Sequence, residues 1–238
     1  MTEFDHAVVI VRDRLQTIAG DFAARGFTLS ELATHNLGTS NRLMVLDSSY
    51  IELLGWFPGE QPTRKDVVDA VPGLEALVFR SHDAHATHDR LTRAGFKMRP
   101  VEELTRPAQY NGTTVQARFL TVRFEQPPLP GIRMYFCQHL TPEYVWRPDL
   151  MRHANGMQRL VQISAYSPDP SATAACVAAI ADVPMTRDGS AAEVSLANLC
   201  LRIEADPALA MARLHGATLV ARDDSSLAMD LTEAALPG

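Results

Sequence analysis

The stretch Arg25-Gly26-Phe27 and its echo Ala94-Gly95-Phe96 decide how this chain folds. Each follows a segment whose apolar residues recur at helical spacing, and each glycine can take the left-handed conformation that ends a helix. A short apolar strand precedes each helix, at residues 7–11 and 74–79. The same strand-helix order therefore occurs twice in the first hundred residues.

Three further β-like runs follow each helix, so each unit has the order β-α-β-β-β. One such unit exposes a face of a four-stranded sheet, whereas two units side by side form a curved sheet with a concave face. We therefore predict an α+β fold in which paired βαβββ repeats form a curved mixed sheet with a cup. The runs are residues 27–33, 42–46 and 50–54 in the first unit, and 97–104, 115–124 and 132–138 in the second.

The rest of the chain reads as a degenerate second pair of units. A strand at residues 160–165 and an alanine-rich helix at 172–181 begin a third unit. A fourth is expected to begin at 199–203, with a helix at 208–214, and to stop before its final strand. That ending predicts either a truncated piece or a unit closed by another chain. We expect one domain at residues 1–147 that carries the site, and a degenerate second half at 148–238 that lacks its final strand.

Composition limits the classes of function. The 238 residues are 46% hydrophobic and 21% charged, which is typical of a globular protein. No stretch has the apolar length of a membrane span, and the acidic N-terminus lacks the apolar region of a signal peptide. A net charge of −6 argues against nucleic acid. We expect a cytoplasmic protein that binds a small molecule, with a homodimer as the expected assembly and the second half as scaffold or dimer surface.

Two polar residues stand out at positions expected to face the cup. His6 begins the first strand, and Glu52 lies within the otherwise apolar segment Tyr50-Ile51-Glu52-Leu53-Leu54. Burying such groups without partners costs free energy, so their presence favours a use over simple packing. Imidazole nitrogen and carboxylate oxygen on neighbouring strands can bind one divalent ion.

These segments resemble a known superfamily. Asp5-His6-Ala7-Val8-Val9-Ile10 together with Tyr50-Ile51-Glu52-Leu53 is similar to the vicinal-oxygen-chelate superfamily, which includes glyoxalase I, extradiol dioxygenases, epimerases and antibiotic-resistance proteins. The run from His35 to Leu43 resembles the "H-x-x-G-T-x-N" stretch of glyoxalase-like domain proteins. Phe136-Cys137-Gln138-His139 and His153-Ala154-Asn155-Gly156 resemble the same branch. The resemblance covers roughly the first 165 residues and indicates the fold better than the reaction.

The resemblance implies that each unit supplies one metal ligand from its first strand and one from its last. His6 and Glu52 match in the first unit. In the second, the first-strand position falls on Ala76, unless Glu75 replaces it after a shift that would turn its side chain to the other face. The last-strand position falls on Gln138, with His139 beside it to orient a substrate, and His153 is a candidate third ligand. The expected cofactor is a divalent metal (Zn, Fe, Mn or Mg), with an empty binding cup as the alternative.

Other polar residues have two interpretations. His35, Asn41 and Arg42 lie around a hairpin of the first unit, where they could hold a polar substrate, but the same segment has ordinary turn chemistry. A cluster of three histidines, His82, His85 and His88, has helical spacing but belongs to a helix expected on the outer surface.

Two functions remain open at this point. The first is a metal-dependent lyase, isomerase or dioxygenase acting on a small oxygenated molecule, with Glu52 as base and Gln138 or His139 orienting the substrate. A dioxygenase would need a second histidine, from His153 or His139, to join the ligand set. The alternative is a non-catalytic protein that binds or sequesters a small molecule.

Overall fold

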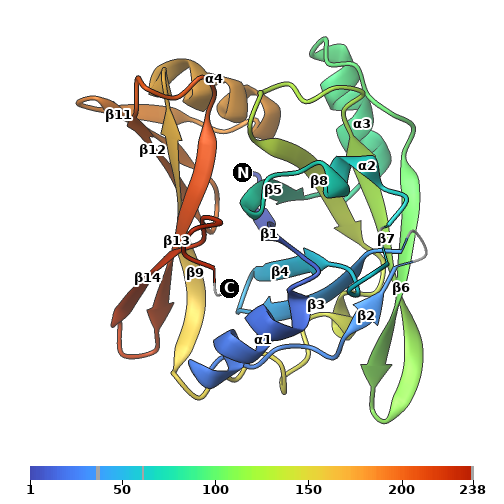
Figure 1. The fold of residues 1–238 in the computed structure, drawn as a ribbon. Helices are drawn as coiled ribbons and strands as arrows, with labels where there is room; N and C mark the ends of the chain where they lie inside the picture. The colour runs from blue at the N-terminus through green and yellow to red at the C-terminus, as the bar shows by residue number, and fades with distance from the viewer. Residues whose placement is uncertain (36–37, 61, 237–238) are drawn as a thin grey trace.

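The fold was analysed in a computed structural model, which describes residues 1–35, 38–60 and 62–236. Two mixed sheets are present, one of eight strands and one of six (Figure 1). The expected α+β architecture of paired βαβββ repeats is confirmed. Part of the turn expected at residues 36–40 lies outside the described residues.

The eight-stranded sheet contains the two repeats. Its strand order is β2-β3-β4-β1-β5-β8-β7-β6, so the two units meet where β1 and β5 run antiparallel. The first unit comprises β1 (Phe4–Arg12), α1 (Leu15–Ala24), β2 (Ala33–Thr34), β3 (Ser40–Val45) and β4 (Tyr50–Gly55). After the short α2 (Lys65–Val68), the second comprises β5 (Gly73–Arg80), α3 (Ala84–Arg93), β6 (Glu102–Tyr110), β7 (Thr113–Arg123) and β8 (Arg133–His139).

Strand alternation divides the side chains of this sheet between two apolar clusters. In β1, Val8 and Ile10 face the cup and pack in one cluster. Val9 and Val11 face the other way and pack in a larger cluster that also contains residues of α1, α3 and the second sheet. The cup interior is therefore lined by one face of the sheet, and the second sheet helps to cover the other.

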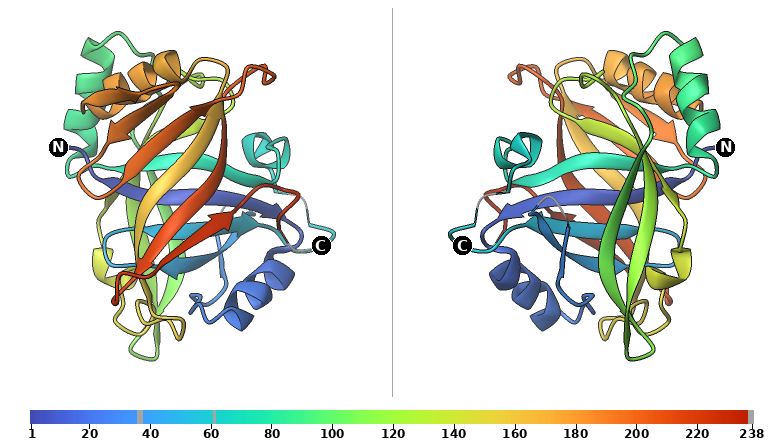
Figure 2. Two further views of the ribbon diagram at one scale, coloured as in Figure 1. Left: turned by 90° about the vertical axis from the view of Figure 1, so that its left-hand side faces the viewer. Right: turned by 90° about the vertical axis from the view of Figure 1, so that its right-hand side faces the viewer.

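The six-stranded sheet repeats the arrangement of the first in part. Its order is β10-β11-β12-β9-β13-β14, and β9 pairs parallel with β12 and antiparallel with β13, as β1 pairs with β4 and β5. Figure 2 shows this sheet lying across the strands of the first. The elements are η1 (Pro142–Tyr144), which precedes it, and then β9 (Met157–Ser167), α4 (Pro170–Ala181), β10 (Met185–Asp188), β11 (Ala191–Ser195), β12 (Cys200–Ala205), β13 (Arg213–Ala221) and β14 (Ser226–Asp230).

The element boundaries differ from expectation in several places, and the strand expected at residues 27–33 is limited to β2. The helix expected at residues 208–214 is wrong, because this segment is a loop that leads into β13. The segment expected to open a fourth unit is instead β12, the last strand of the third, because it pairs parallel with β9. The strand expected at 97–104 begins later, as β6. Short alternating segments do not distinguish a strand that opens a unit from one that closes it; only pairing does.

Candidate functional site

The site begins with a β-bulge in β1. Where β1 pairs with β5, Phe4 opposes Phe79 and His6 opposes Val78, so Asp5 is an extra residue with no opposing partner. A bulge re-aims the side chains around it, which here brings Asp5 and His6 together although they are consecutive. The His6 Nδ1 and Asp5 Oδ1 atoms are 2.7 Å apart, and both side chains are buried.

Asp5 is a fully engaged carboxylate. Its Oδ1 also contacts His139 Nε2 at 3.0 Å, and its Oδ2 accepts a hydrogen bond from Arg80 Nε at 3.0 Å. Burial alone would raise the pKa of Asp5, but the charges and hydrogen bonds of His139 and His6 lower it well below its usual range. Asp5 is therefore ionised, and its Oδ1 accepts a hydrogen bond from His6 Nδ1. The other ring nitrogen of His6, Nε2, faces the cup.

Glu52 lies opposite His6 Nε2. Glu52 Oε2 is 3.8 Å from His6 Nε2, while Glu52 Oε1 accepts a hydrogen bond from Asn41 Nδ2 at 2.6 Å. Burial opposes ionisation of Glu52, but His6, the Asn41 hydrogen bond and the charge of Arg106 together lower its pKa. One oxygen of an ionised carboxylate is thus anchored by Asn41, and the other is directed toward His6.

Tyr135 completes this corner. Its hydroxyl is 3.2 Å from His6 Nε2, and the ring of His6 stacks on Tyr50 with centroids 4.3 Å apart. Burial, reinforced by Glu52, raises the pKa of Tyr135, so the phenol is neutral. The imidazole of His6 is held in position by a carboxylate, a ring face and a hydroxyl.

Tyr135 and Ala76 occupy the second unit's counterparts of Glu52 and His6. Strand β1 of the first unit corresponds to β5 of the second. In their pairing, His6 opposes Val78 and Val8 opposes Ala76, so superposing the first unit on the second would place His6 at the position of Ala76. Glu52 pairs with Val8, and Tyr135 pairs with Val78, so the same superposition would place Glu52 at the position of Tyr135. A second bulge, at Glu75, lies directly before Ala76. Glu75 forms an ion pair with Arg133 at 2.7 Å, and Ala76 stands where a first-strand ligand would lie.

Several residues singled out in the sequence lie in this cup. His6, His35, Asn41 and Glu52 line one small cavity of about 40 Å³. Burial lowers the pKa of His35 to about 4, so its imidazole is neutral. His139 lies at the rim of the same face, where its ring packs against Trp146 at 4.7 Å. The aromatic segment around Trp146 thus packs with the cup-side cluster.

Other residues are not brought into the cup. Gln138 Oε1 accepts a hydrogen bond from Ala84 N at 2.8 Å, at the start of α3. Arg42 donates to Ser30 O at 2.9 Å. His153 uses both ring nitrogens on backbone groups, Thr28 N at 3.0 Å and Val45 O at 2.9 Å. Each of these side chains joins elements outside the cavity; His82 and His85 are exposed and His88 is partly exposed.

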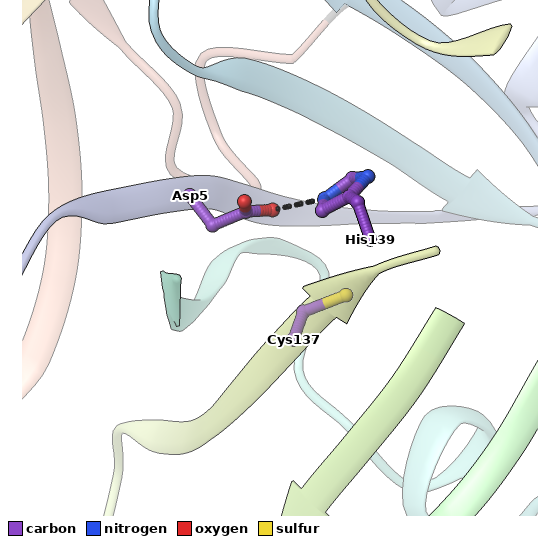
Figure 3. A group of neighbouring side chains, drawn as sticks. All are labelled: Asp5, Cys137 and His139. Atoms are coloured by element: carbon purple, nitrogen blue, oxygen red, sulfur yellow. Dashed lines mark hydrogen bonds and ion pairs between the residues drawn. The ribbon is translucent and has the colours of Figure 1, made fainter. Parts of the chain in front are cut away.

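A second group with metal-ligating atoms lies behind His6. Asp5, Cys137 and His139 have candidate ligand atoms within 4.8 Å of one another (Figure 3). Burial, with Asp5 and Glu52 nearby, raises the pKa of the Cys137 thiol well above its usual value. Metals bind the thiolate, and the oxygens of Asp5 are already engaged, so this group suits a proton-holding network better than an ion. Cys137 and Asp5 had no distinguishing signal in the sequence, because the bulge that aims Asp5 inward depends on pairing.

The pair His6 and Glu52 fits a divalent cation in part. Their facing atoms border a cavity large enough for an ion or a water molecule. Asn41 Oδ1, which lines the same cavity, is buried and has no hydrogen-bond partner among the described residues. A nitrogen, a carboxylate oxygen and a neutral oxygen form a mixed set that suits Mn²⁺, Fe²⁺, Zn²⁺ or Mg²⁺ held with additional waters.

The comparisons with known proteins identify the family. A model of the glyoxalase-like domain matches residues 4–181, and the chain therefore belongs to the glyoxalase-like domain family. None of the curated proteins matches it.

Solved structures share the fold at low sequence identity. A hypothetical protein from Staphylococcus aureus aligns with a TM-score of 0.72 and 14% identity, covering 93% of this chain and 92% of that one. A xylose isomerase-like TIM barrel/4-hydroxyphenylpyruvate dioxygenase fusion protein aligns with a TM-score of 0.60 and 15% identity, over 92% of this chain and 36% of that one. A 4-hydroxymandelate synthase mutant from Streptomyces coelicolor aligns with a TM-score of 0.52 and 14% identity, over 86% and 62%. At these identities the likenesses show a shared fold, which agrees with the repeats expected from the sequence. Within the described part of the chain, no helix has the length and apolar character needed to cross a membrane.

Proposed function

We propose that this chain is a metal-dependent enzyme that acts on a small oxygenated molecule by proton transfer, as a lyase or an isomerase. One observation carries the proposal. His6 Nε2 and Glu52 Oε2 face each other at 3.8 Å across a buried cavity, and Asp5 holds the opposite nitrogen of His6. A carboxylate behind a metal-ligating histidine is the usual second-sphere support of such ligands.

The cup residues would divide the work. A cation held by His6 and Glu52 would supply Lewis acidity toward the oxygens of a substrate. Glu52 keeps Oε1 on Asn41, and Oε2, when it is not bound to the cation, would accept a proton from a carbon next to a carbonyl group. Tyr135, a neutral phenol beside His6, can donate a hydrogen bond to the oxygen on which negative charge develops.

Ring-cleaving dioxygenase chemistry has less support. It normally uses two histidines and one carboxylate as ligands. In the described part of the chain, His6 is paired with Glu52, but neither His139 nor His153 joins them, since His139 contacts Asp5 and His153 binds backbone groups. Two structural neighbours carry dioxygenase or synthase in their names, but at 14–15% identity they share only the fold.

The second candidate function is binding without turnover. The observation that favours it is Ala76, which stands where the second unit would supply a first-strand ligand. A cup with an incomplete ligand set can still enclose a small molecule among Leu43, Leu54 and Phe119.

Metal titration tests the proposal. Protein purified without chelator is analysed for bound metal, stripped, and titrated with Mn²⁺ and Zn²⁺ by calorimetry. We expect one ion per chain in the wild type, with binding abolished in His6→Ala and in the nearly isosteric Glu52→Gln. His82→Ala, which changes an exposed histidine, is the matched control and should bind as the wild type does.

Cys137→Ala separates the two metal-ligating groups. Binding that survives Cys137→Ala supports the His6–Glu52 pair. Loss in Cys137→Ala with retention in Glu52→Gln would transfer the ion to Asp5, Cys137 and His139. Absence of binding in the wild type would overturn the metal-dependent enzyme and leave the sequestering protein.

A further inference from the structure

The cup contains an arginine whose charge no described side chain neutralises. Arg123 ends β7 and lies directly beside Tyr135 in the pairing of β7 with β8. Its Nε is buried without a hydrogen-bond partner, and its guanidinium forms no ion pair with any described residue. Its Cζ atom lies 5.4 Å from the centroid of the Tyr135 ring. Arg123 is half-buried, and a partly desolvated guanidinium without a counter-ion favours the binding of an anion.

The neighbouring charges do not cancel this one. Arg64 is paired with Asp66, with nitrogen and oxygen 2.5 Å apart, and Arg133 is paired with Glu75 at 2.7 Å. Both arginines line the same cavities as Arg123. Around the outer cavity, Arg64, Lys65, Arg99, Arg123 and Arg133 stand against the two carboxylates Asp66 and Glu125, so positive groups outnumber negative ones at this end of the cup.

Arg123 also lies where two cavities join. The inner cavity, of about 40 Å³, contains His6 and Glu52. An outer cavity of about 500 Å³ is lined by Lys65, Arg99, Phe124 and Met134. Arg64, Arg123, Arg133 and Tyr135 border both cavities. The outer cavity has the size of a small-molecule site, and its lining combines Phe124, Pro127, Met134 and Tyr135 with a larger number of charged residues.

We propose that the ligand of this cup is an organic anion, a carboxylate-bearing molecule with an apolar body, whose negative group pairs with Arg123. The planar guanidinium matches a carboxylate with two parallel hydrogen bonds. The body of the ligand lies in the outer cavity against Phe124 and Met134, and its oxygenated end reaches Tyr135 and the inner cavity. This assignment of substrate class rests on the proposed function for the reacting end, but the anion site itself does not need a metal.

Matched ligands test the charge directly. Benzoate and benzamide have nearly the same shape, and only benzoate is charged. We expect calorimetry to show that benzoate binds the wild type at least about tenfold more tightly, because hydrogen bonds to charged groups are roughly twice as strong as neutral ones. Phenyl phosphate, tested alongside, distinguishes a phosphate site from a carboxylate site: tighter binding of phenyl phosphate would overturn the carboxylate assignment.

Variants locate the binding. Arg123→Gln should lose the preference for benzoate over benzamide, whereas Arg118→Gln should keep it. Arg118 lies on the same strand but is exposed and paired with Glu103, so it is the matched control. Arg123→Lys keeps the charge without the planar fork and should recover only part of the preference. Equal binding of both ligands, no benzoate binding at millimolar concentration, or an unchanged preference in Arg123→Gln would overturn the proposal.

Thermal melts show whether Arg123 is needed for folding instead of ligand binding. Removing an unpaired buried charge should leave the melting temperature of Arg123→Gln unchanged or higher, whereas an arginine needed for folding would lower it. Benzoate should raise the melting temperature of the wild type but not of Arg123→Gln. His6→Ala should still bind benzoate, so failure of the metal proposal and failure of the anion proposal give different results.

Discussion

At the scale of single residues, Asp5 connects the candidate site to the charges around it. Its carboxylate contacts His6, His139 and Arg80, which all belong to strands of the eight-stranded sheet. We predict that Asp5→Asn lowers metal affinity by about 10- to 100-fold, which is typical when the outer-sphere partner of a ligating histidine is lost. It should also reduce stability by about 1.5–3 kcal/mol, typical of a hydrogen bond to a charged group, because Arg80 loses its ion pair with this carboxylate.

Glu3→Gln is the control for Asp5→Asn. Glu3 also pairs with Arg80, at 2.9 Å, but it is partly exposed and has no contact with His6. Calorimetric titration and urea unfolding of both variants separate the two effects. Equal metal affinity in Asp5→Asn and Glu3→Gln would contradict the role given to Asp5.

The buried side chain of His35 makes the free energy of unfolding depend on pH. Burial lowers its pKa from 6.5 to about 4, so as the pH falls the unfolded chain takes up a proton before the folded one does. The contribution of His35 to the free energy of unfolding is complete above about pH 6.5 and is lost as the pH falls toward 4. The difference between its two pKa values corresponds to about 3 kcal/mol.

We predict that His35→Gln loses less stability than the wild type between pH 7 and pH 5 in urea unfolding. His153 and His215, whose pKa values burial also lowers, act in the same direction in both proteins. The difference between wild type and variant therefore isolates His35. Parallel losses in the two proteins would refute this reading.

At the scale of elements, Gln138 joins β8 to the start of α3. The first amide groups of a helix have no partner inside it, and Gln138 Oε1 accepts the one from the fully buried Ala84. We predict that Gln138→Ala lowers the free energy of unfolding by about 1–3 kcal/mol, the cost of an unsatisfied buried donor. Gln138→Glu keeps an acceptor and adds a charge that helix N-termini favour, so it should be close to wild type.

Metal binding distinguishes this role from a catalytic one. Because Gln138 points away from the cup, both variants should bind metal as the wild type does. Reduced metal affinity in Gln138→Ala, with stability unchanged, would place the side chain in the site after all.

At the scale of the whole molecule, glycines mark where the two sheets meet. Gly131, in the turn before β8, has a φ of +87°, and a Cβ there would lie 2.0 Å from Ala212 O, in the loop before β13. Gly112 has a φ of +74° with nothing within 4 Å. Both positions favour glycine, but only Gly131 is also pressed against the other half of the chain.

We predict that Gly131→Ala destabilises the protein by several kcal/mol, whereas Gly112→Ala costs only the conformational strain of about 1–2 kcal/mol. We further propose that residues 1–147 and 148–238 unfold together, because one apolar cluster contains residues of both sheets. Scanning calorimetry checks both statements. Two separate transitions, or equal losses in the two glycine variants, would show that the halves are independent.

The sequence was sufficient for the fold and for half of the site. Periodicity and the repeated Gly-Phe endings identified the two units, and His6 and Glu52 stood out as polar residues in apolar strands. Asp5, Tyr135 and Arg123 did not stand out, because each owes its position to pairing between strands distant in sequence. The family resemblance indicated Gln138 as the last-strand residue of the cup, whereas strand pairing puts Tyr135 at the counterpart of Glu52, and Gln138 contacts the start of α3. A three-residue error along a strand changes the face as well as the position.

The two bulges, one before His6 and one before Ala76, occupy equivalent places in the two units. The first unit carries His6 and Glu52, whereas the second carries Arg123, which suits recognition, and Tyr135, which contacts His6. Away from Tyr135, substitutions in the second copy can then change which molecule is accepted without disturbing His6 and Glu52. Such a scaffold can acquire new ligands by drift in one copy alone, a freedom that a symmetric pair of identical half-sites would lack.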